Sequence, residues 1–152
     1  MTKDVIESPS PAAAADEVED ALLSSDLQVV NDELLRRGFH ADVYFDSDDS
    51  SLSDESRDRL ARNADLLKSQ PQFNLTIEGH TDERGTADDN LALGERRANA
   101  VRDYLAMLGV DGNRMRTISY GAERPVCVDS VESCWSQNRR AHMVVTGRSN
   151  VG

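Results

Sequence analysis

The sequence has few basic residues and no long apolar run. Its 152 residues carry 17 Lys and Arg against 28 Asp and Glu, a formal net charge of −11. This charge argues against nucleic-acid binding, because phosphate binding needs a basic surface that displaces counterions. No apolar run approaches the roughly 20 residues that a membrane-spanning helix requires. The N-terminus also lacks a charged-then-apolar export signal, so we expect either a cytoplasmic protein or a chain trimmed after its export signal.

Cysteine and histidine are also scarce. The two cysteines, Cys127 and Cys134, lie seven residues apart in a loop-like stretch, a spacing that fits neither a CxxC redox pair nor a four-ligand zinc site. Two free thiols and a local disulfide both fit the sequence, and a disulfide would favour an oxidising compartment. Of His40, His80 and His142, only His80 falls at the end of a predicted strand. Without a second histidine at ligand spacing, we expect neither a metal site nor a catalytic triad.

The first quarter of the chain differs from the rest in composition. Residues 1–38 contain nine acidic residues and three basic ones. Their net charge, 3 − 9 = −6, is more than half of the −11 of the whole chain. Their Pro/Ser/Ala-rich start is typical of flexible linkers, while the later apolar residues recur at near-helical spacing up to a helix stop at Gly38. We therefore predict an acidic, flexible to partly helical leader over 1–38, one domain over 39–148 and a short C-terminal tail over 149–152.

The domain alternates between strand-like and helix-like segments. Ser53 and Thr86 are candidate N-caps, and the helices that follow them would end before Pro71 and at Gly109. Alternating apolar residues predict strands around these helices. The order predicts an α/β (α+β) fold: a βαβαβ-β two-layer sandwich, in which a mixed four-stranded sheet has its helices packed on one face. The predicted strands span residues 41–48, 73–79, 115–121 and 139–147.

A cluster of charges follows the second predicted strand, in the stretch "TIEGHTDERGTADDNLALGERRANAV". Asp82 lies just past the carboxyl end of the strand, where α/β sheets bind ligands, and Arg97 lies within the next helix. Leu93, Arg97 and Val101 share i+4 spacing, which puts Arg97 on or beside the inward stripe. A carboxylate beside a guanidinium could clamp a zwitterion, the first binding an ammonium and the second a carboxylate. Alternatively, Asp82 and Arg97 pair with each other or with nearby charges.

The motifs along the chain resemble those of the OmpA-like, peptidoglycan-associating domain. The ordered set is FD, GHTD, N, RRA, YG, P and NRR, and the similarity covers roughly residues 40–147. Within this group, "TDERGT" followed by "NLALGERRA" is most similar to the peptidoglycan-associated lipoproteins, or Pal proteins. The resemblance implies a module without catalysis or cofactor, which binds the diaminopimelate residue of the peptidoglycan stem peptide.

The resemblance also implies a role for individual residues. Asp82 would bind the ammonium of diaminopimelate and Arg97 its carboxylate, while Arg84 and Arg96 are expected to be scaffold or solvent-facing. We expect substitution of Asp82 or Arg97 by Ala to abolish binding and to leave the fold intact. The expected binding residues are Asp46, Ser47, Asp48, Asp82, Asn90, Leu93, Arg97 and Arg139.

The same resemblance implies a place in the cell envelope. We expect a periplasmic protein held at the outer membrane by a lipid anchor that this chain does not contain, with the acidic leader as a tether between membrane and wall. A TolB-type β-propeller, as in the Tol-Pal system, is the implied protein partner. Two alternatives stay open: the wall-anchoring domain of an OmpA-like porin or flagellar stator protein, and a module that binds only other proteins.

Overall fold

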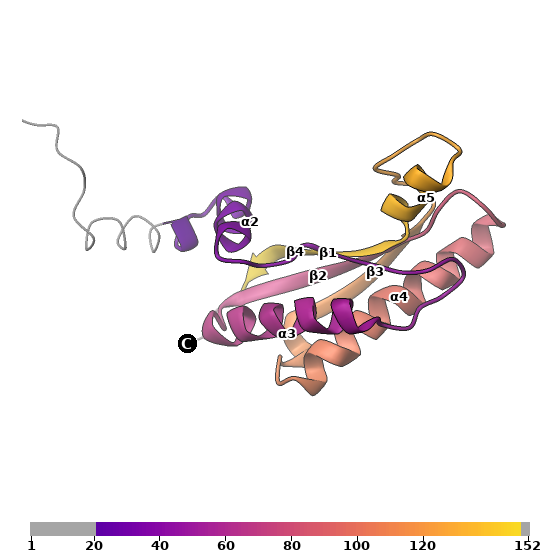
Figure 1. The fold of residues 1–152 in the computed structure, drawn as a ribbon. Coiled ribbons are helices and arrows are strands. Elements are labelled where there is room, and N and C mark those ends of the chain that lie inside the picture. Colours follow the sequence, from indigo (N-terminus) through magenta and orange to yellow (C-terminus); the bar gives the residue numbers. More distant parts are fainter. Residues whose placement is uncertain (1–20, 150–152) are drawn as a thin grey trace, which may run out of the picture.

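The computed structural model describes residues 21–149 (Figure 1). Residues 1–20, where most of the expected flexible leader falls, and residues 150–152 of the expected tail lie outside the described residues. The strands are β1 (Asp42–Tyr44), β2 (Phe73–His80), β3 (Met115–Gly121) and β4 (Arg140–Arg148). The helices are α2 (Leu27–Arg36), α3 (Asp54–Ser69), α4 (Ala87–Met107), the 3₁₀-helix η1 (Gly112–Arg114) and α5 (Glu132–Asn138). Within this range, every helix is too short or too polar to cross a membrane.

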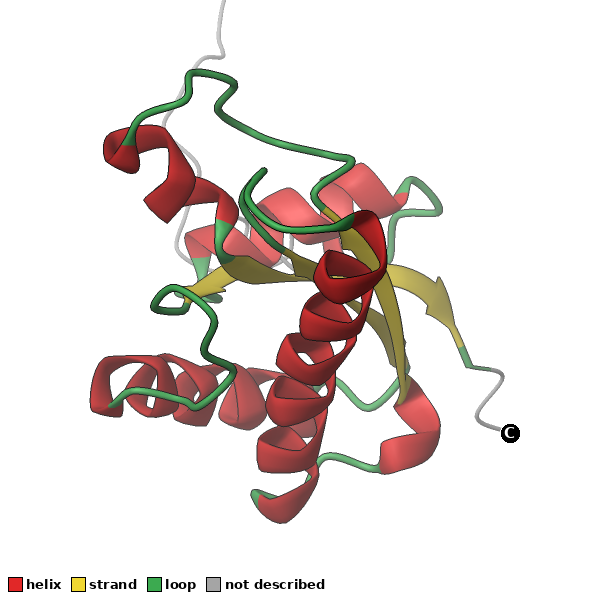
Figure 2. Cartoon of the chain, turned by 90° about the vertical axis from the view of Figure 1, so that its right-hand side faces the viewer, coloured by secondary structure: helices red, strands yellow, loops and turns green. Residues whose placement is uncertain are grey.

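The four strands form one mixed sheet in the order β1-β4-β2-β3. β2 and β3 run parallel to each other, while β4 is antiparallel to both of its neighbours. The chain crosses from β2 to β3 through α4, which contacts both strands. The two long helices, α3 and α4, lie on one face of the sheet (Figures 1 and 2). The predicted mixed four-stranded sheet and its α+β class are therefore confirmed.

The two long helices begin at the polar residues that the sequence indicates. The Ser53 side chain accepts a hydrogen bond from the backbone N–H of Ser56, and Thr86 accepts one from Asp89. Such caps satisfy amide groups that the first turn of a helix leaves without a partner. The second cap matters most for function, because it sets where α4 starts after the loop that follows β2.

The hydrophobic core lies between the sheet and the helices. Phe73, Leu75 and Ile77 alternate along β2, and all three are buried. Helix α2 contributes Val30 and Leu34 to the same cluster. Burying a side chain of this size stabilises a fold by about 1.5–3 kcal/mol. The helix that ends the expected leader is therefore packed on the domain.

Helix α2 also closes an open edge of the sheet. β1 pairs with β4 only from Arg140 to His142, so the rest of β4 has no strand on that side. Along that part of β4, the side-chain amide of Asn31 takes the place of a neighbouring strand. It accepts a hydrogen bond from the Val145 backbone N–H at 2.9 Å and donates one to the Val145 carbonyl at 3.0 Å. Unpaired strand edges promote association between chains, and this contact covers one.

The segment between β3 and β4, which is predicted to be a loop, contains the short helix α5. A disulfide joins Cys127, before this helix, to Cys134 within it, with 5.0 Å between their Cα atoms. Cys134 is buried. The disulfide therefore ties α5 to the loop that precedes it, close to the end of β2.

Candidate functional site

A pocket of about 200 Å³ opens where β2 ends and α4 begins. Three segments build it: the turn after β1, the loop after β2 and the first three turns of α4. This location, beyond the carboxyl end of a strand, is where α/β sheets commonly bind ligands. The lining residues are Ser47, Asp48, Thr81, Asp82, Arg84, Gly85, Asn90, Leu93 and Arg97.

All eight residues expected from the sequence lie in or directly behind this pocket. Those that line it are Ser47, Asp48, Asp82, Asn90, Leu93 and Arg97. The other two support it from behind. The Asp46 carbonyl accepts a hydrogen bond from Arg97 at 2.9 Å, and an Arg139 Nη1 lies 3.5 Å from the Asp82 carboxylate. The fold thus brings together residues from four separate segments of the chain: the turn after β1, the loop after β2, helix α4 and the residue that precedes β4.

Arg97 is a fully buried cation in the third turn of α4. Its Nε donates a hydrogen bond to the carbonyl of Asp49 at 2.8 Å, its Nη1 to that of His80 at 3.0 Å and its Nη2 to that of Asp46 at 2.9 Å. Burial lowers the pKa of Arg97 to about 10, so the group is still charged at neutral pH. A guanidinium has five N–H groups, and three are used here. The other two donate to none of these three carbonyls.

The turn after β1 is shaped around this guanidinium. The backbone N–H of Asp49 donates to the Asp46 carbonyl at 3.2 Å, and Asp48 has a φ of 59°. Such left-handed backbone costs most residues about 1–2 kcal/mol, although Asp adopts it more readily than most. The turn directs the carbonyls of Asp46 and Asp49 toward Arg97. Arg97 therefore holds this wall of the pocket in place from the neighbouring helix.

Asp82 supplies the negative charge of the pocket. Its carboxylate accepts hydrogen bonds from Nη2 and Nε of Arg84, at 2.7 and 3.2 Å, and from the Arg84 backbone N–H at 3.0 Å. Burial favours the neutral acid, but these hydrogen bonds outweigh it, so the pKa of Asp82 is lowered. Its ion-pair partners are Arg84 and Arg139. This is the pairing with nearby charges that the sequence left open.

Arg84 is solvent-facing, as expected, with a side chain that is 43% exposed, and it also forms part of the pocket wall. Its Nη2 also donates to the Ser47 hydroxyl at 3.1 Å, and its guanidinium lies 4.2 Å from the centre of the Trp135 ring. The sequence carries a signal for this position. An Asp side chain often bonds the backbone N–H two residues on, which keeps residue 84 beside the Asp82 carboxylate. Arg96 is also exposed, but it does not line the pocket.

The remaining wall comes from the start of α4. The Asn90 side chain, which is 7% exposed, brings a donor and an acceptor to the pocket. Leu93, one turn further, adds apolar surface that suits a methylene chain. Gly85, at φ 97°, precedes the helix and lets the loop turn in a conformation that L side chains rarely adopt. The pocket therefore combines a carboxylate, guanidinium groups, an amide and one apolar face.

The side chain of His80 does not line the pocket. The ring of His80 hydrogen-bonds Glu78 at 3.1 Å and packs 5.6 Å from the ring of Tyr120, and only the His80 carbonyl reaches Arg97. Across residues 21–149, the His, Cys, Asp and Glu side chains form no group of three that could hold a metal ion. The charges of the pocket suit a ligand that carries both an ammonium and a carboxylate.

The comparisons with known proteins identify the family of the region that contains the pocket. The OmpA family model matches residues 44–144, which contain the whole pocket. A peptidoglycan-associated lipoprotein of Brucella melitensis is 55% identical over 105 residues, 69% of this chain and 62% of the relative. Another from Rhizobium meliloti is 56% identical over 105 residues, 69% of this chain and 60% of the relative. The chain therefore matches less than two thirds of the length of these relatives.

Solved structures show the same fold. The peptidoglycan-associated lipoprotein of Burkholderia pseudomallei matches with a TM-score of 0.69 and 47% identity, covering 70% of this chain and 91% of that one. The C-terminal domain of Helicobacter pylori MotB matches with a TM-score of 0.67, covering 73% of this chain and 88% of that one. Its identity is 18%, so this second likeness concerns the fold alone.

Proposed function

Because this chain belongs to the OmpA family, we propose that it binds peptidoglycan reversibly and without catalysis, through the diaminopimelate residue of the stem peptide. The observation that carries the proposal is the pocket at the end of β2, which Asp82 and Arg97 both line. The curated relatives of 51–56% identity are named peptidoglycan-associated lipoproteins. The charges of the pocket thus support a zwitterionic ligand. The names of the relatives separately support a wall polymer that contains such a group.

The mechanism of binding follows from the charges of the pocket. The diaminopimelate ammonium would join Arg84 and Arg139 around the Asp82 carboxylate, which has about four lone-pair sites for hydrogen bonds. The ligand carboxylate would take the two N–H groups of Arg97 that the backbone carbonyls leave free. Charge-assisted bonds of this kind are about twice as strong as neutral ones. Leu93 would cover the methylene chain between the two charges.

In the cell, this binding would link the outer membrane to the wall. The envelope setting of the relatives supports a periplasmic location, with a lipid anchor upstream of the described residues. The disulfide between Cys127 and Cys134 also suits an oxidising compartment. A reversible, modest affinity fits this task, because a few hydrogen bonds to one stem residue must offset the cost of ordering the ligand.

The test is a titration with a diaminopimelate-containing muropeptide, followed by backbone amide shifts. We expect shifts at Ser47, Asp48, Thr81 and Asn90, which line the pocket. The matched ligand is the lysine-containing counterpart, which lacks the second carboxylate. It should bind at least about tenfold more weakly, since one charge-assisted hydrogen bond contributes about 1.5–3 kcal/mol. Equal affinity for both ligands would contradict the assignment of Arg97.

Asp82→Asn provides the matched protein control. It preserves the size of the side chain but removes the charge that holds the ammonium, so binding of the diaminopimelate muropeptide should be lost. The far surface of the protein should keep its wild-type amide spectrum. Binding by this variant at wild-type affinity would rule out the pocket as the site.

A protein partner is a further part of the proposal. The family resemblance implies a TolB-type β-propeller, and a pull-down with such a protein tests it directly. If the propeller binds and neither muropeptide does, the domain functions as a protein-binding module and the peptidoglycan assignment fails.

A further inference from the structure

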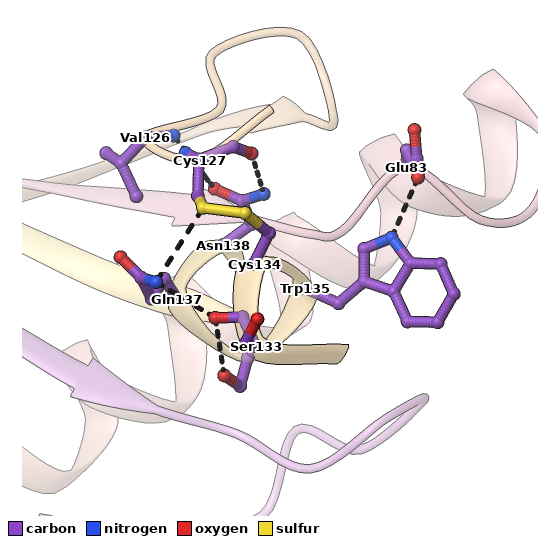
Figure 3. The surroundings of a disulfide bond; sticks show 9 residues. Glu83, Val126, Cys127, Ser133, Cys134, Trp135, Gln137 and Asn138 are labelled. Atoms are coloured by element: carbon purple, nitrogen blue, oxygen red, sulfur yellow. Dashed lines mark hydrogen bonds between the residues drawn. A yellow bond between two sulfur atoms is a disulfide. The ribbon is translucent and has the colours of Figure 1, made fainter. Parts of the chain in front are cut away.

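The disulfide-closed loop between β3 and β4 contacts both arginines that hold Asp82. Figure 3 shows its surroundings, with the sulfur atoms of Cys127 and Cys134 joined beside α5. Two residues of α5 flank Cys134 closely in sequence, Glu132 two positions before it and Trp135 directly after it. Each of these residues leads to Asp82 through a different arginine.

The first connection passes through Trp135. Its ring lies against the guanidinium of Arg84, 4.2 Å from the ring centre, and its indole N–H donates to a Glu83 carboxylate oxygen at 2.8 Å (Figure 3). Arg84 in turn bonds the Asp82 carboxylate through two nitrogens. A cation over an aromatic face gains about 0.5–1 kcal/mol at an exposed site. Trp135 thus fixes the direction in which Arg84 approaches Asp82.

The second connection passes through Glu132. Its two carboxylate oxygens accept hydrogen bonds from Nη1 and Nη2 of Arg139, at 3.2 and 2.8 Å. The same Nη1 lies 3.5 Å from the Asp82 carboxylate, and the Nε of Arg139 donates to the Phe45 carbonyl. This fork-to-fork pairing orients the guanidinium as well as stabilising it. Helix α5 therefore contacts and orients both arginines that pair with Asp82.

Helix α5 needs an anchor of its own. It has seven residues, and its N-cap, Val131, provides no side-chain hydrogen bond. Helices this short are not stable by themselves. Two contacts tie it to the loop that precedes it: the disulfide through Cys134, and the Asn138 side chain, which accepts from the backbone N–H groups of Val126 and Cys127 and donates to the Cys127 carbonyl. Both contacts converge on Cys127.

We propose that the Cys127–Cys134 disulfide is a positioning element of the ligand pocket. By fixing the start of α5 it keeps Glu132 and Trp135 against Arg139 and Arg84, and these two arginines orient the Asp82 carboxylate. The choice of ligand rests on the proposed function, whereas the connection from the disulfide to Asp82 does not. A disulfide that served stability alone would leave the affinity of the folded protein unchanged.

The first test compares affinities for the diaminopimelate muropeptide by titration calorimetry. Cys127→Ser combined with Cys134→Ser should weaken binding about tenfold, a typical size for coupled residues in one network. Asn31→Ala is the matched control, because it removes the hydrogen bonds of α2 to Val145 and contacts no residue of the pocket. It should lower stability and leave affinity unchanged. Wild-type affinity in the double serine variant would overturn the proposal.

Two variants keep the disulfide and test the connections separately. Trp135→Ala and Glu132→Gln should each weaken binding by part of the loss seen in the double serine variant. Adding Trp135→Ala to the serine variant should cost less than it does alone, because the serine variant has already released the ring. Fully additive losses would show that the disulfide acts elsewhere, and would overturn the proposal.

A measurement without ligand separates this proposal from the proposed function. The Asp82 carboxyl can be titrated by carbon NMR in wild-type protein and in the serine variant. We expect the pKa of Asp82 to rise in the variant, because Arg84 and Arg139 would no longer be held beside it. A rise with no muropeptide binding by wild-type protein would refute the proposed function and support the positioning role. An unchanged titration curve would refute the positioning role.

Discussion

Gly79 of β2 and Gly94 of α4 lie in direct backbone contact. A β carbon added at residue 79 would lie 1.7 Å from the carbonyl oxygen of Gly94, closer than any real contact. This approach brings α4 onto the end of β2, so that Arg97, in the next turn of the helix, meets the carbonyl of His80 at 3.0 Å. The pocket exists because two glycines allow the helix to lie this close to the strand.

Gly79→Ala should therefore destabilise the domain by about 3 kcal/mol, the upper range for overpacking, because the atoms in the way belong to the backbone. Gly147→Ala is the matched control in β4, where an added β carbon would be in ordinary contact with Asn74. Its effect should stay within about 0.5 kcal/mol. Urea unfolding of both variants measures the difference. Equal unfolding midpoints would mean that the contact of Gly79 with Gly94 is not a constraint.

Substitution of Arg97 should cost stability as well as binding, contrary to the expectation that the Ala variant keeps its fold intact. In Arg97→Lys a single ammonium replaces a planar fork that reaches three carbonyls. At least one buried carbonyl among Asp46, Asp49 and His80 would lose its partner, which costs about 1–3 kcal/mol. Urea unfolding should show this loss, and muropeptide titration should show no binding. A variant of wild-type stability would contradict the structural role.

Arg84→Ala should weaken muropeptide binding about fivefold, because the Asp82 carboxylate would lose a charged two-nitrogen partner that orients it. Arg96→Ala removes the same charge from an exposed position of α4 and should bind like wild type. Calorimetric titration of these two variants separates the effect of orienting the Asp82 carboxylate from the effect of net charge. If Arg84→Ala bound more tightly than wild type, Arg84 would be a competitor of the ligand ammonium instead.

The stability of the domain should fall as pH rises past the pKa of His142. Its hydrogen bond with Asp42, at 2.9 Å, raises the pKa of His142 above its ordinary value of 6.5. Because the folded pKa is the higher one, the stabilisation is complete below 6.5 and is lost as pH rises through the raised value. Nearby Glu78 acts in the same direction, and Arg140 and burial oppose it.

His142→Gln is the test of that dependence. Urea midpoints of wild-type protein should decrease as pH rises above about 6.5, the range in which a histidine of raised pKa loses its proton. The variant should show a flatter profile over the same range. If the wild-type and variant midpoints changed in parallel with pH, the pH dependence of stability would come from another group.

Much of the fold follows from local patterns. The Ser53 and Thr86 caps, the alternation along β2 and the i+4 stripe of Leu93, Arg97 and Val101 all depend on residues near one another in sequence. These features could be predicted from the sequence because they depend on such local patterns. The meeting of Asp82 with Arg97 in one pocket also follows, since a strand end and the next helix start are neighbours in an α/β layer.

Other features depend on contacts between distant segments. The part that Arg84 plays in the pocket wall could not be predicted, because its partners Ser47 and Trp135 lie 37 and 51 residues away in sequence. Arg97 looked like a ligand group alone, because the carbonyls of Asp46 and Asp49 come from a turn about fifty residues earlier. Helix α5 has seven residues and no side-chain cap, so its sequence shows no helical periodicity from which it could be predicted.

The contact of Asn31 with β4 has a practical consequence for dissecting the protein. A fragment that began at residue 39 would match the family region but would expose the backbone groups of Val145 that Asn31 now occupies. It would also uncover the apolar surface beneath Val30 and Leu34. Such a fragment is expected to self-associate, and one that starts upstream of α2 is expected to be monomeric at the same concentration. We therefore expect the smallest autonomous unit to be longer than the region that the family model matches.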